Sequence, residues 1–209
     1  MHPLVRRMLP TFLLLPATFA IAGAQTVCDH LAPMGLLPPA GGFRFGCAFH
    51  YTLKLGATLG PAGNYILLDY PACASGPCAG QAGLTQLQCA ATNGYFCCVS
   101  TSQMIPTIVG TSVATLVAGL NQRIANDTDT RSGICFSAYT GNGSRVGNAP
   151  LIQFIGTDRS QAQLTGFLRF FLVGPPSGSS TSTTIPVEFI SDLTPAQGST
   201  WGQLKLLYR

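Results

Sequence analysis

The chain has 209 residues, of which only 9% are charged, well below the roughly 25% of ordinary soluble domains. The formal net charge is +4, the basic residues after Arg7 stand singly, and only two lysines occur, Lys54 and Lys205. Binding to the phosphates of DNA or RNA needs clustered Lys and Arg. From this composition we therefore expect no nucleic-acid partner.

The N-terminus has the pattern of an export signal. Arg6 and Arg7 precede an uncharged apolar run over 8–22, and the small residues at 22–24 offer a cleavage site before Gln25. The apolar run is shorter than the roughly 20 residues needed to span a bilayer. Cleavage is therefore expected, with a retained anchor as the alternative.

This pattern divides the chain into a signal peptide over 1–24 and one extracytoplasmic domain over 25–209, and the second part has the length of a single domain. Contact with a membrane is expected only if the N-terminal segment is retained. Three prolines and a Gly-Gly pair make 25–42 an irregular lead-in, and 175–184 is a Ser/Thr/Gly-rich segment predicted to be a flexible loop.

Eight cysteines follow the predicted signal, and an even number in an exported chain predicts disulfides, although their pairing stays open. Cys97 and Cys98 are adjacent, so in an extended strand their side chains face opposite sides and should bond to different partners. The segment from Cys73 to Cys78 is short enough to close as a small disulfide loop. The disulfide candidates are Cys28, Cys47, Cys73, Cys78, Cys89, Cys97, Cys98 and Cys135.

Alternation of apolar and polar residues predicts the best-defined strand over 43–55, with one face apolar and the other in water. Shorter apolar runs, separated by turn residues, predict further strands. These runs cover 65–70, 95–99, 134–139, 150–155, 163–173, 185–190 and 203–208.

Two segments have helical periodicity. One helix is predicted over 84–91 and should end at the Asn-Gly pair at 93–94. The other is predicted over 113–124, with Thr111 or Ser112 as its N-terminal cap. Roughly seven to nine strands with about two helices predict a disulfide-stapled α+β domain of mostly antiparallel sheet, built as a sandwich or an open barrel.

Few side chains offer catalytic chemistry. After signal removal only His30 and His50 remain as histidine bases, and no G-x-S-x-G serine elbow occurs. Asp69 follows an ordered-looking strand and is interpreted as a turn or cap residue. We predict no enzyme and no catalytic residue, and a secreted hydrolase that uses Asp69 with His50 or a cysteine is the alternative.

Metal-binding patterns are weak as well. Cys73 and Cys78 have no second matching pair of ligands for zinc. The segment 126–131 lacks the glycine and the later glutamate of a calcium loop, so we interpret it as the solvated exit of the second helix. We predict no metal site and no cofactor.

A carbohydrate- or surface-binding module is a second alternative, because such modules use exposed aromatic side chains. The aromatic residues of this chain do not gather into a visible platform. Trp201 is the only tryptophan, and the tyrosines are spread over positions 51, 65, 70, 95, 139 and 208.

The middle of the chain contains a string of the form G-N-F/Y-x-x-L-D over 63–69, followed by a turn at Gly94 and a helix that carries residues 120–124. In these motifs and their order, from about 43 to 190, the chain resembles TadG-like proteins of tight-adherence (Flp) pilus assembly. It departs from them in its cleavable start and in having no D-x-S-x-S metal site. The matching positions are Gly63, Asn64, Tyr65, Leu68, Asp69, Gly94, Leu120, Asn121, Arg123 and Ile124.

The resemblance implies a bacterial envelope-associated or secreted accessory domain and no enzyme. The leading hypothesis is therefore a non-enzymatic protein of the periplasm or cell surface that contacts protein partners of the envelope or pilus machinery. Asn64, Asp69 and Asn121 are expected to organise turns and helix ends. The core is expected to contain Leu67, Leu116, Leu120, Ile124, Phe167 and Phe170.

Overall fold

The computed structural model describes residues 24–55, 64–108, 112–157, 159–178 and 183–193. The predicted α+β class with a mostly antiparallel sheet, two α-helices and paired cysteines is confirmed. The strands are β1 (Thr26–Val27), β2 (Met34–Leu37), β3 (His50–Leu55), β4 (Asn64–Leu68), β5 (Val99–Ser100), β6 (Met104–Ile108), β7 (Val146–Phe154), β8 (Gln161–Leu172) and β9 (Thr184–Asp192). The helices are α1 (Gly83–Asn93), α2 (Val113–Ala125) and the short 3-10 helix η1 (Phe136–Ala138).

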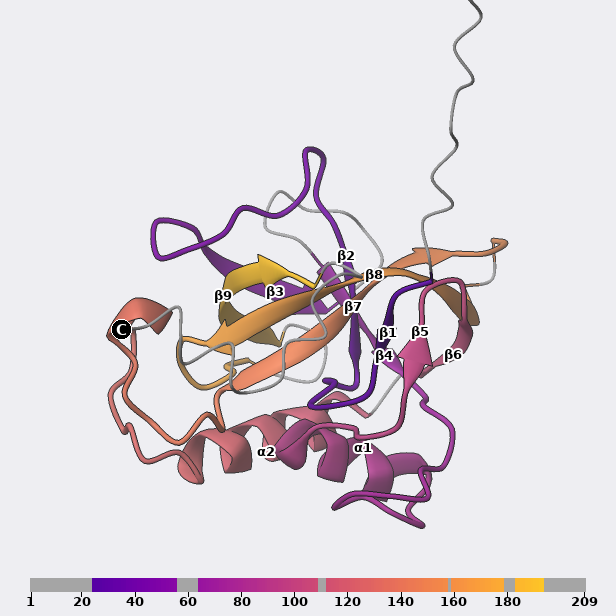
Figure 1. Cartoon of the computed structure of the whole chain (residues 1–209), viewed down its shortest axis with the longest axis horizontal. Helices are drawn as coiled ribbons and strands as arrows, with labels where there is room; N and C mark the ends of the chain where they lie inside the picture. Colours follow the sequence, from indigo (N-terminus) through magenta and orange to yellow (C-terminus); the bar gives the residue numbers. More distant parts are fainter. Residues whose placement is uncertain (1–23, 56–63, 109–111, 158, 179–182, 194–209) are drawn as a thin grey trace, which may run out of the picture.

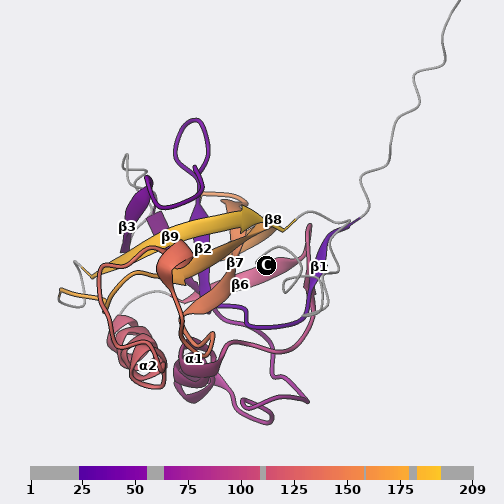
Figure 2. The same ribbon diagram turned by 60° about the vertical axis from the view of Figure 1, so that its left-hand side comes forward.

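Within the described residues, seven strands form one mixed sheet that closes on itself. They run in the order β2-β7-β8-β6-β4-β3-β9, and further pairings join β2 to β4 and β8 to β9. β4 pairs with β3 at its start and with β6 at its end, while β8 pairs with β6 at its start and with β9 at its end. The sheet is therefore a barrel closed by hydrogen bonds. The two-stranded β1–β5 sheet lies at its side (Figure 2).

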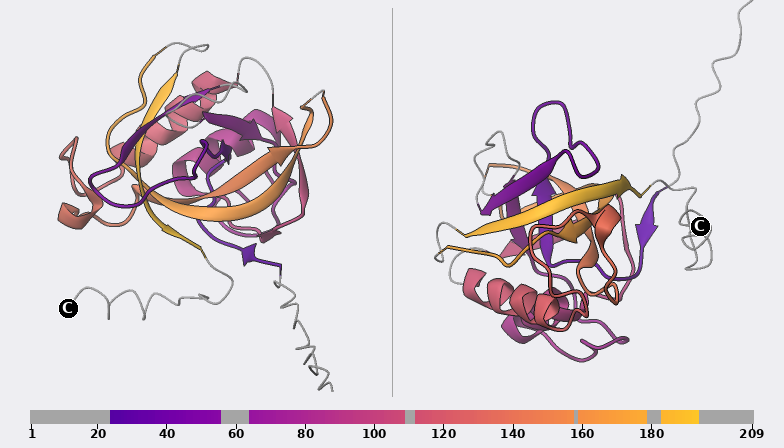
Figure 3. Two further views of the ribbon diagram at one scale, coloured as in Figure 1. Left: turned by 90° about the horizontal axis from the view of Figure 1, so that it is seen from above. Right: turned by 90° about the vertical axis from the view of Figure 1, so that its left-hand side faces the viewer.

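The two α-helices lie side by side along one end of the barrel (Figures 1 and 3). β4 is buried along its whole length, and its alternate residues belong to two different hydrophobic clusters. Tyr65 and Leu67 belong to the first cluster, and Ile66 and Leu68 belong to the second. A strand covered on both faces has a continuous apolar sequence. The first cluster also contains the helix residues Leu87, Ala91, Val113, Leu116 and Leu120.

The helices approach each other closely at Gly119 of α2. A Cβ atom at this position would lie 2.4 Å from Cβ of Ala91 in α1. We expect Gly119→Ala to destabilise the fold by about 1–3 kcal/mol through overpacking, although alanine is the better helix former. Ala118→Gly, at an exposed position of the same helix, should lower the stability of the fold by about 1 kcal/mol. Urea unfolding would measure both variants. A stabilising Gly119→Ala change would show that the helices do not touch here.

All eight cysteines form disulfides: Cys28–Cys98, Cys47–Cys135, Cys73–Cys97 and Cys78–Cys89. The prediction that Cys97 and Cys98 bond to different partners is confirmed. The predicted small loop between Cys73 and Cys78 is wrong, because α1 follows this segment and carries Cys89 to Cys78. Four disulfides are typical of proteins in oxidising compartments.

The boundaries of both α-helices agree with the prediction. α1 ends at Gly94, which has a positive φ of 88°, and α2 begins directly after Ser112. The Ser112 side chain makes no capping hydrogen bond, so the predicted cap is wrong in that detail. None of the described helices is long and apolar enough to cross a bilayer.

Several predicted strands are wrong. Residues 43–49 form a loop, because Gly46 has a φ of +88° and accepts a turn hydrogen bond from Phe49. The strand predicted over 134–139 is largely the 3-10 helix η1, and the strand predicted over 95–99 contributes an isolated bridge at Tyr95 and only the first residue of β5.

The lead-in is also more ordered than expected, since 25–42 contains β1 and β2. β6 was missing from the prediction because Pro106 interrupts its apolar pattern. Three predictions lie wholly or partly outside the described residues. They are the signal peptide over 1–24, of which only residue 24 is described, the strand over 203–208, and residues 179–182 of the predicted loop.

Candidate functional site

The segment 38–49, here named the β2–β3 loop, projects from the barrel (Figure 1). Its Phe45 and Phe49 are exposed large hydrophobic residues, and the Arg44 guanidinium lies 5.3 Å from the centre of the Phe49 ring. The loop is nevertheless held to the rest of the domain at two points. The Phe43 ring packs 4.3 Å from the Phe189 ring of β9, and Cys47 is bonded to Cys135.

Side chains of types that can bind metal ions gather at this disulfide. His50 begins β3 directly after the loop, and its Nε2 lies 3.8 Å from Sγ of Cys135. Glu188 is the cross-strand partner of His50, and its Oε2 lies 3.6 Å from the same Nε2. The carboxylate is buried and also accepts the backbone N–H of Phe136 at 2.8 Å. We name this set, Cys47, His50, Cys135 and Glu188, the Cys–His–Glu cluster.

A second group of ionisable side chains lies after α2, where the sequence predicted a solvated exit. Instead, Asp127 and Asp129 are each only 6% exposed. Asp127 accepts hydrogen bonds from the hydroxyl of Tyr139 and the backbone N–H of Arg145. Asp129 accepts two side-chain hydrogen bonds from Arg131, at 2.9 and 2.7 Å. The prediction is wrong because the chain folds back over both carboxylates.

Two buried arginines complete this group. The Arg145 guanidinium donates to the backbone carbonyls of Leu172 and Val173 on one side and to those of Asp129 and Arg131 on the other. It also lies over the ring of Phe171, at 4.6 Å. This side chain therefore holds the 127–131 segment against the end of β8.

Arg123 of α2 is also fully buried, and it donates to the carbonyls of Ser144 and Val146. Its third guanidinium nitrogen, Nη1, makes no hydrogen bond within the described part of the chain. Burial lowers the pKa of Arg123 to about 10. The hydrogen bonds from Arg131, followed by that from the Thr140 backbone, hold the pKa of Asp129 far below its usual range.

His30 provides a test of pH dependence. Burial, and secondly the positive charge of Arg123, lower the pKa of its imidazole from the ordinary value of 6.5. When the pH falls below that value, the unfolded chain takes up a proton at His30 that the folded chain does not, so the folded state loses stability. Asp129 contributes in the same direction only in a more acidic range, because its ordinary pKa is 3.8.

We therefore expect the urea midpoint to fall from pH 7 to pH 5, and His30→Gln to flatten that slope. Urea unfolding at a series of pH values would measure both. Equal slopes in the two proteins would contradict the assignment.

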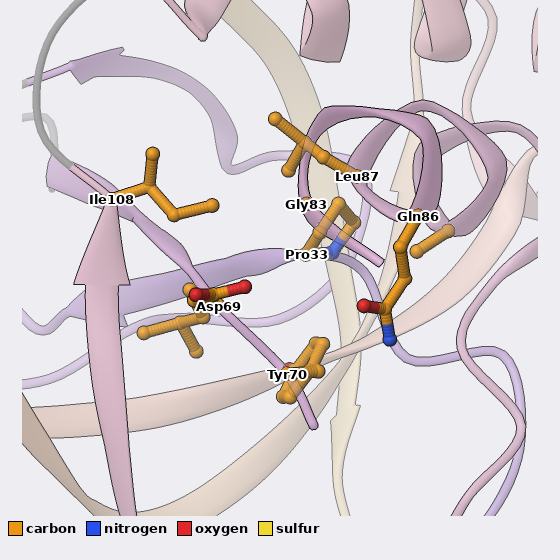
Figure 4. A pocket seen from close by; sticks show the side chains of 9 residues that line it. Pro33, Asp69, Tyr70, Gly83, Gln86, Leu87 and Ile108 are labelled. Carbon is orange, nitrogen blue, oxygen red and sulfur yellow. The ribbon is translucent and has the colours of Figure 1, made fainter. Parts of the chain in front are cut away.

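Asp69 lies at the end of β4, beside a hollow lined also by Pro33, Tyr70, Gln86 and Ile108 (Figure 4). The hollow holds only about 10 Å³, roughly the space of one water molecule. Gln86 is turned to the carbonyl of Pro71, to which its amide donates at 2.9 Å. The backbone N–H of Asp69 donates to the carbonyl of Pro106, so it continues the antiparallel β4–β6 pairing rather than forming a turn.

The structure does not bring together the residues of the alternative reading, a secreted hydrolase. Asp69 lines the hollow beside α1, whereas His50 belongs to the Cys–His–Glu cluster. Every cysteine is in a disulfide, so none of them offers a thiol.

A carbohydrate-binding module would need exposed aromatic side chains. The described tyrosines are buried or half-buried, and Trp201 and Tyr208 lie outside the described residues.

The family-motif positions divide between β4 and the helices. Asn64, Tyr65 and Leu68 are buried in β4, Gly94 ends α1, and Gly63 lies outside the described residues. The remaining motif positions, Leu120, Asn121, Arg123 and Ile124, lie in α2. Asn121 is an exposed residue inside the helix, so its expected role at a helix end is wrong, and Asn126 is the C-cap instead.

Sequence reasoning missed Glu188 and Arg145. Glu188 is the only glutamate, and its position in an apolar strand was the available signal that its carboxylate is buried with a partner.

Comparisons with protein-family models, curated proteins and solved structures find no match to this chain.

Proposed function

We propose that this chain is a non-enzymatic, disulfide-stabilised domain that works outside the cytoplasm through contacts with other proteins. The observation that carries the proposal is the β2–β3 loop, which presents Arg44, Phe45 and Phe49 on a segment held at Phe43 and at Cys47. Aromatic residues and arginine are enriched at protein interfaces. A loop that is ordered before binding loses less conformational entropy when it binds.

The reactive side chains support the same proposal. Asp127, Asp129 and Glu188 are buried and hydrogen-bonded to the neighbouring backbone. The cysteines are engaged in disulfides. In the oxidised protein these groups therefore stabilise the fold, and the exposed chemistry of the loop is that of recognition.

The resemblance to TadG-like proteins extends the proposal to its biological setting. The partners would belong to the bacterial envelope or to the pilus-assembly machinery, and the protein would work in the periplasm or at the cell surface. The described disulfides favour such an oxidising compartment.

A photo-crosslinking amino acid at position 49 tests the contact surface in the cell that produces the protein. We expect a discrete crosslinked band at Phe49 and none at Leu84, which is equally apolar and 55% exposed but lies on α1. Fractionation with thiol alkylation tests the location, because exported protein should have no alkylatable thiols. Crosslinking at Leu84 alone, or abundant cytoplasmic protein with free thiols, would overturn the proposal.

A further inference from the structure

We propose that the Cys–His–Glu cluster is a redox-controlled zinc site. Oxidised, Cys47 and Cys135 form the disulfide. After reduction, their two thiolates, His50 Nε2 and the Glu188 carboxylate bind one Zn²⁺. This inference goes beyond the proposed function and does not depend on it, because it rests only on the arrangement of these four side chains.

The distances from His50 Nε2 to the Cys135 sulfur and to the Glu188 carboxylate fit a zinc site. The Cys47, His50 and Cys135 donors all lie within 4.8 Å of one another. His50 Nε2 is 3.8 Å from the Cys135 sulfur and 3.6 Å from Glu188 Oε2. A tetrahedral zinc ion with bonds of about 2.0–2.3 Å separates its ligand atoms by roughly 3.3–3.8 Å. The two sulfurs must move apart, which breaking their bond allows, and the Glu188 carboxylate, which lies outside the 4.8 Å set, must approach them.

The surrounding structure orients the ligands. His50 and Glu188 face each other across the β3–β9 pairing, and Glu188 is buried. The backbone N–H of Phe136, next to Cys135 in the chain, donates to the carboxylate. Such hydrogen bonds to metal ligands are a common feature of protein metal sites. Cys47 and His50 are exposed, so an external thiol and a metal ion can both reach the cluster.

The chemistry needs an external dithiol as reductant. One of its thiolates attacks the exposed Cys47 sulfur, which forms a mixed disulfide and releases the Cys135 sulfur as a thiolate. The second thiol of the reductant then displaces Cys47. Two electrons pass to the protein, the reductant becomes a disulfide, and zinc binds as the two cysteines give up their protons. A disulfide of the same reagent class, acting as the two-electron oxidant, reverses these steps: it re-forms the Cys47–Cys135 bond, becomes a dithiol and releases the metal.

The Cys28–Cys98 bond is the matched control. Both of its cysteines are exposed, yet within the part of the chain that the structure describes no third ligand group joins them. The other two bonds each contain a cysteine that is only 2% exposed, Cys73 or Cys78. Mild reduction should therefore open the two exposed bonds first, and only one of them should generate a metal site.

The test uses the exported protein, treated with limiting dithiothreitol and desalted without oxygen. Alkylation and mass spectrometry identify the opened bonds, and Co²⁺ is the spectroscopic probe. We expect one Co²⁺ per chain with the strong visible bands of tetrahedral thiolate ligation. The Cys28→Ser/Cys98→Ser variant should keep these bands, and Cys47→Ser/Cys135→Ser should lose them. Zn²⁺ should displace the Co²⁺.

Two variants keep the disulfide and so protect the test against misfolding. His50→Ala and Glu188→Gln should each weaken Co²⁺ binding after reduction by on the order of tenfold or more. Reduced protein without tetrahedral bands would overturn the proposal. So would unchanged binding in His50→Ala, or an equal loss of binding in the Cys28→Ser/Cys98→Ser control.

Discussion

Replacing Arg145 by methionine is expected to destabilise the fold by about 3–5 kcal/mol, the usual result of removing one partner from a buried ionic network. The side chain is 1% exposed and donates four hydrogen bonds to backbone carbonyls. Methionine fills a similar volume but donates nothing, so these carbonyls would lose their charged donor while still shielded from water. The buried Asp127 would also lose a nearby positive charge.

Urea unfolding measures this loss directly, and the Tm should fall by about 10 °C or more. Arg159→Met is the matched control, because Arg159 is exposed and lies over the Phe154 ring. That change should stay within about 0.5 kcal/mol of the unchanged protein. Similar effects of the two substitutions would show that Arg145 does not hold the 127–131 segment.

Gly94→Ala is the second change with a large expected effect. Gly94 has φ 88° and ψ 154°, a conformation that is essentially confined to glycine and costs other residues about 1–3 kcal/mol. In addition, a Cβ atom here would lie 2.5 Å from Cα of His30. To relieve that clash the two segments would have to move apart, which would lengthen the backbone hydrogen bonds between Leu31 and Tyr95. We expect a total loss of at least about 3 kcal/mol.

Gly133→Ala separates the two causes. Gly133 also has a positive φ, of 74°, but a Cβ atom there would meet nothing within 4 Å. Backbone strain alone should cost about 1–2 kcal/mol. Urea unfolding of both variants would give the difference, which measures the close approach of His30 to the end of α1. No difference would mean that the two segments are not in contact.

The local elements were predictable because their signals are local. The helical spacing over 113–124 and the glycine after α1 gave both α-helices, and the apolar runs gave β4, β7, β8 and β9 within a few residues. Residues 43–49 also alternate, but alternation does not reveal a backbone turn at Gly46. A 3-10 helix stands in place of the strand expected near Phe136, and the backbone N–H of Phe136 donates to the Glu188 side chain.

The sites were not predictable because they depend on contacts between distant residues. Cys47 and Cys135 are 88 positions apart, and the register that places Glu188 opposite His50 exists only in the folded sheet. Nor does residue type distinguish the buried Arg145 from the exposed Arg159. Burial of a charged side chain is decided by which carbonyls the fold leaves unpaired, and no short pattern encodes that.

The order of the disulfides along the chain has a consequence for maturation. The bonds Cys78–Cys89, Cys73–Cys97 and Cys28–Cys98 are nested one inside the next. If cysteines paired in the order in which they emerge from a secretion channel, none of the native bonds would form. We therefore expect the yield of exported protein to depend on an enzyme that reshuffles mispaired bonds more than on the oxidant.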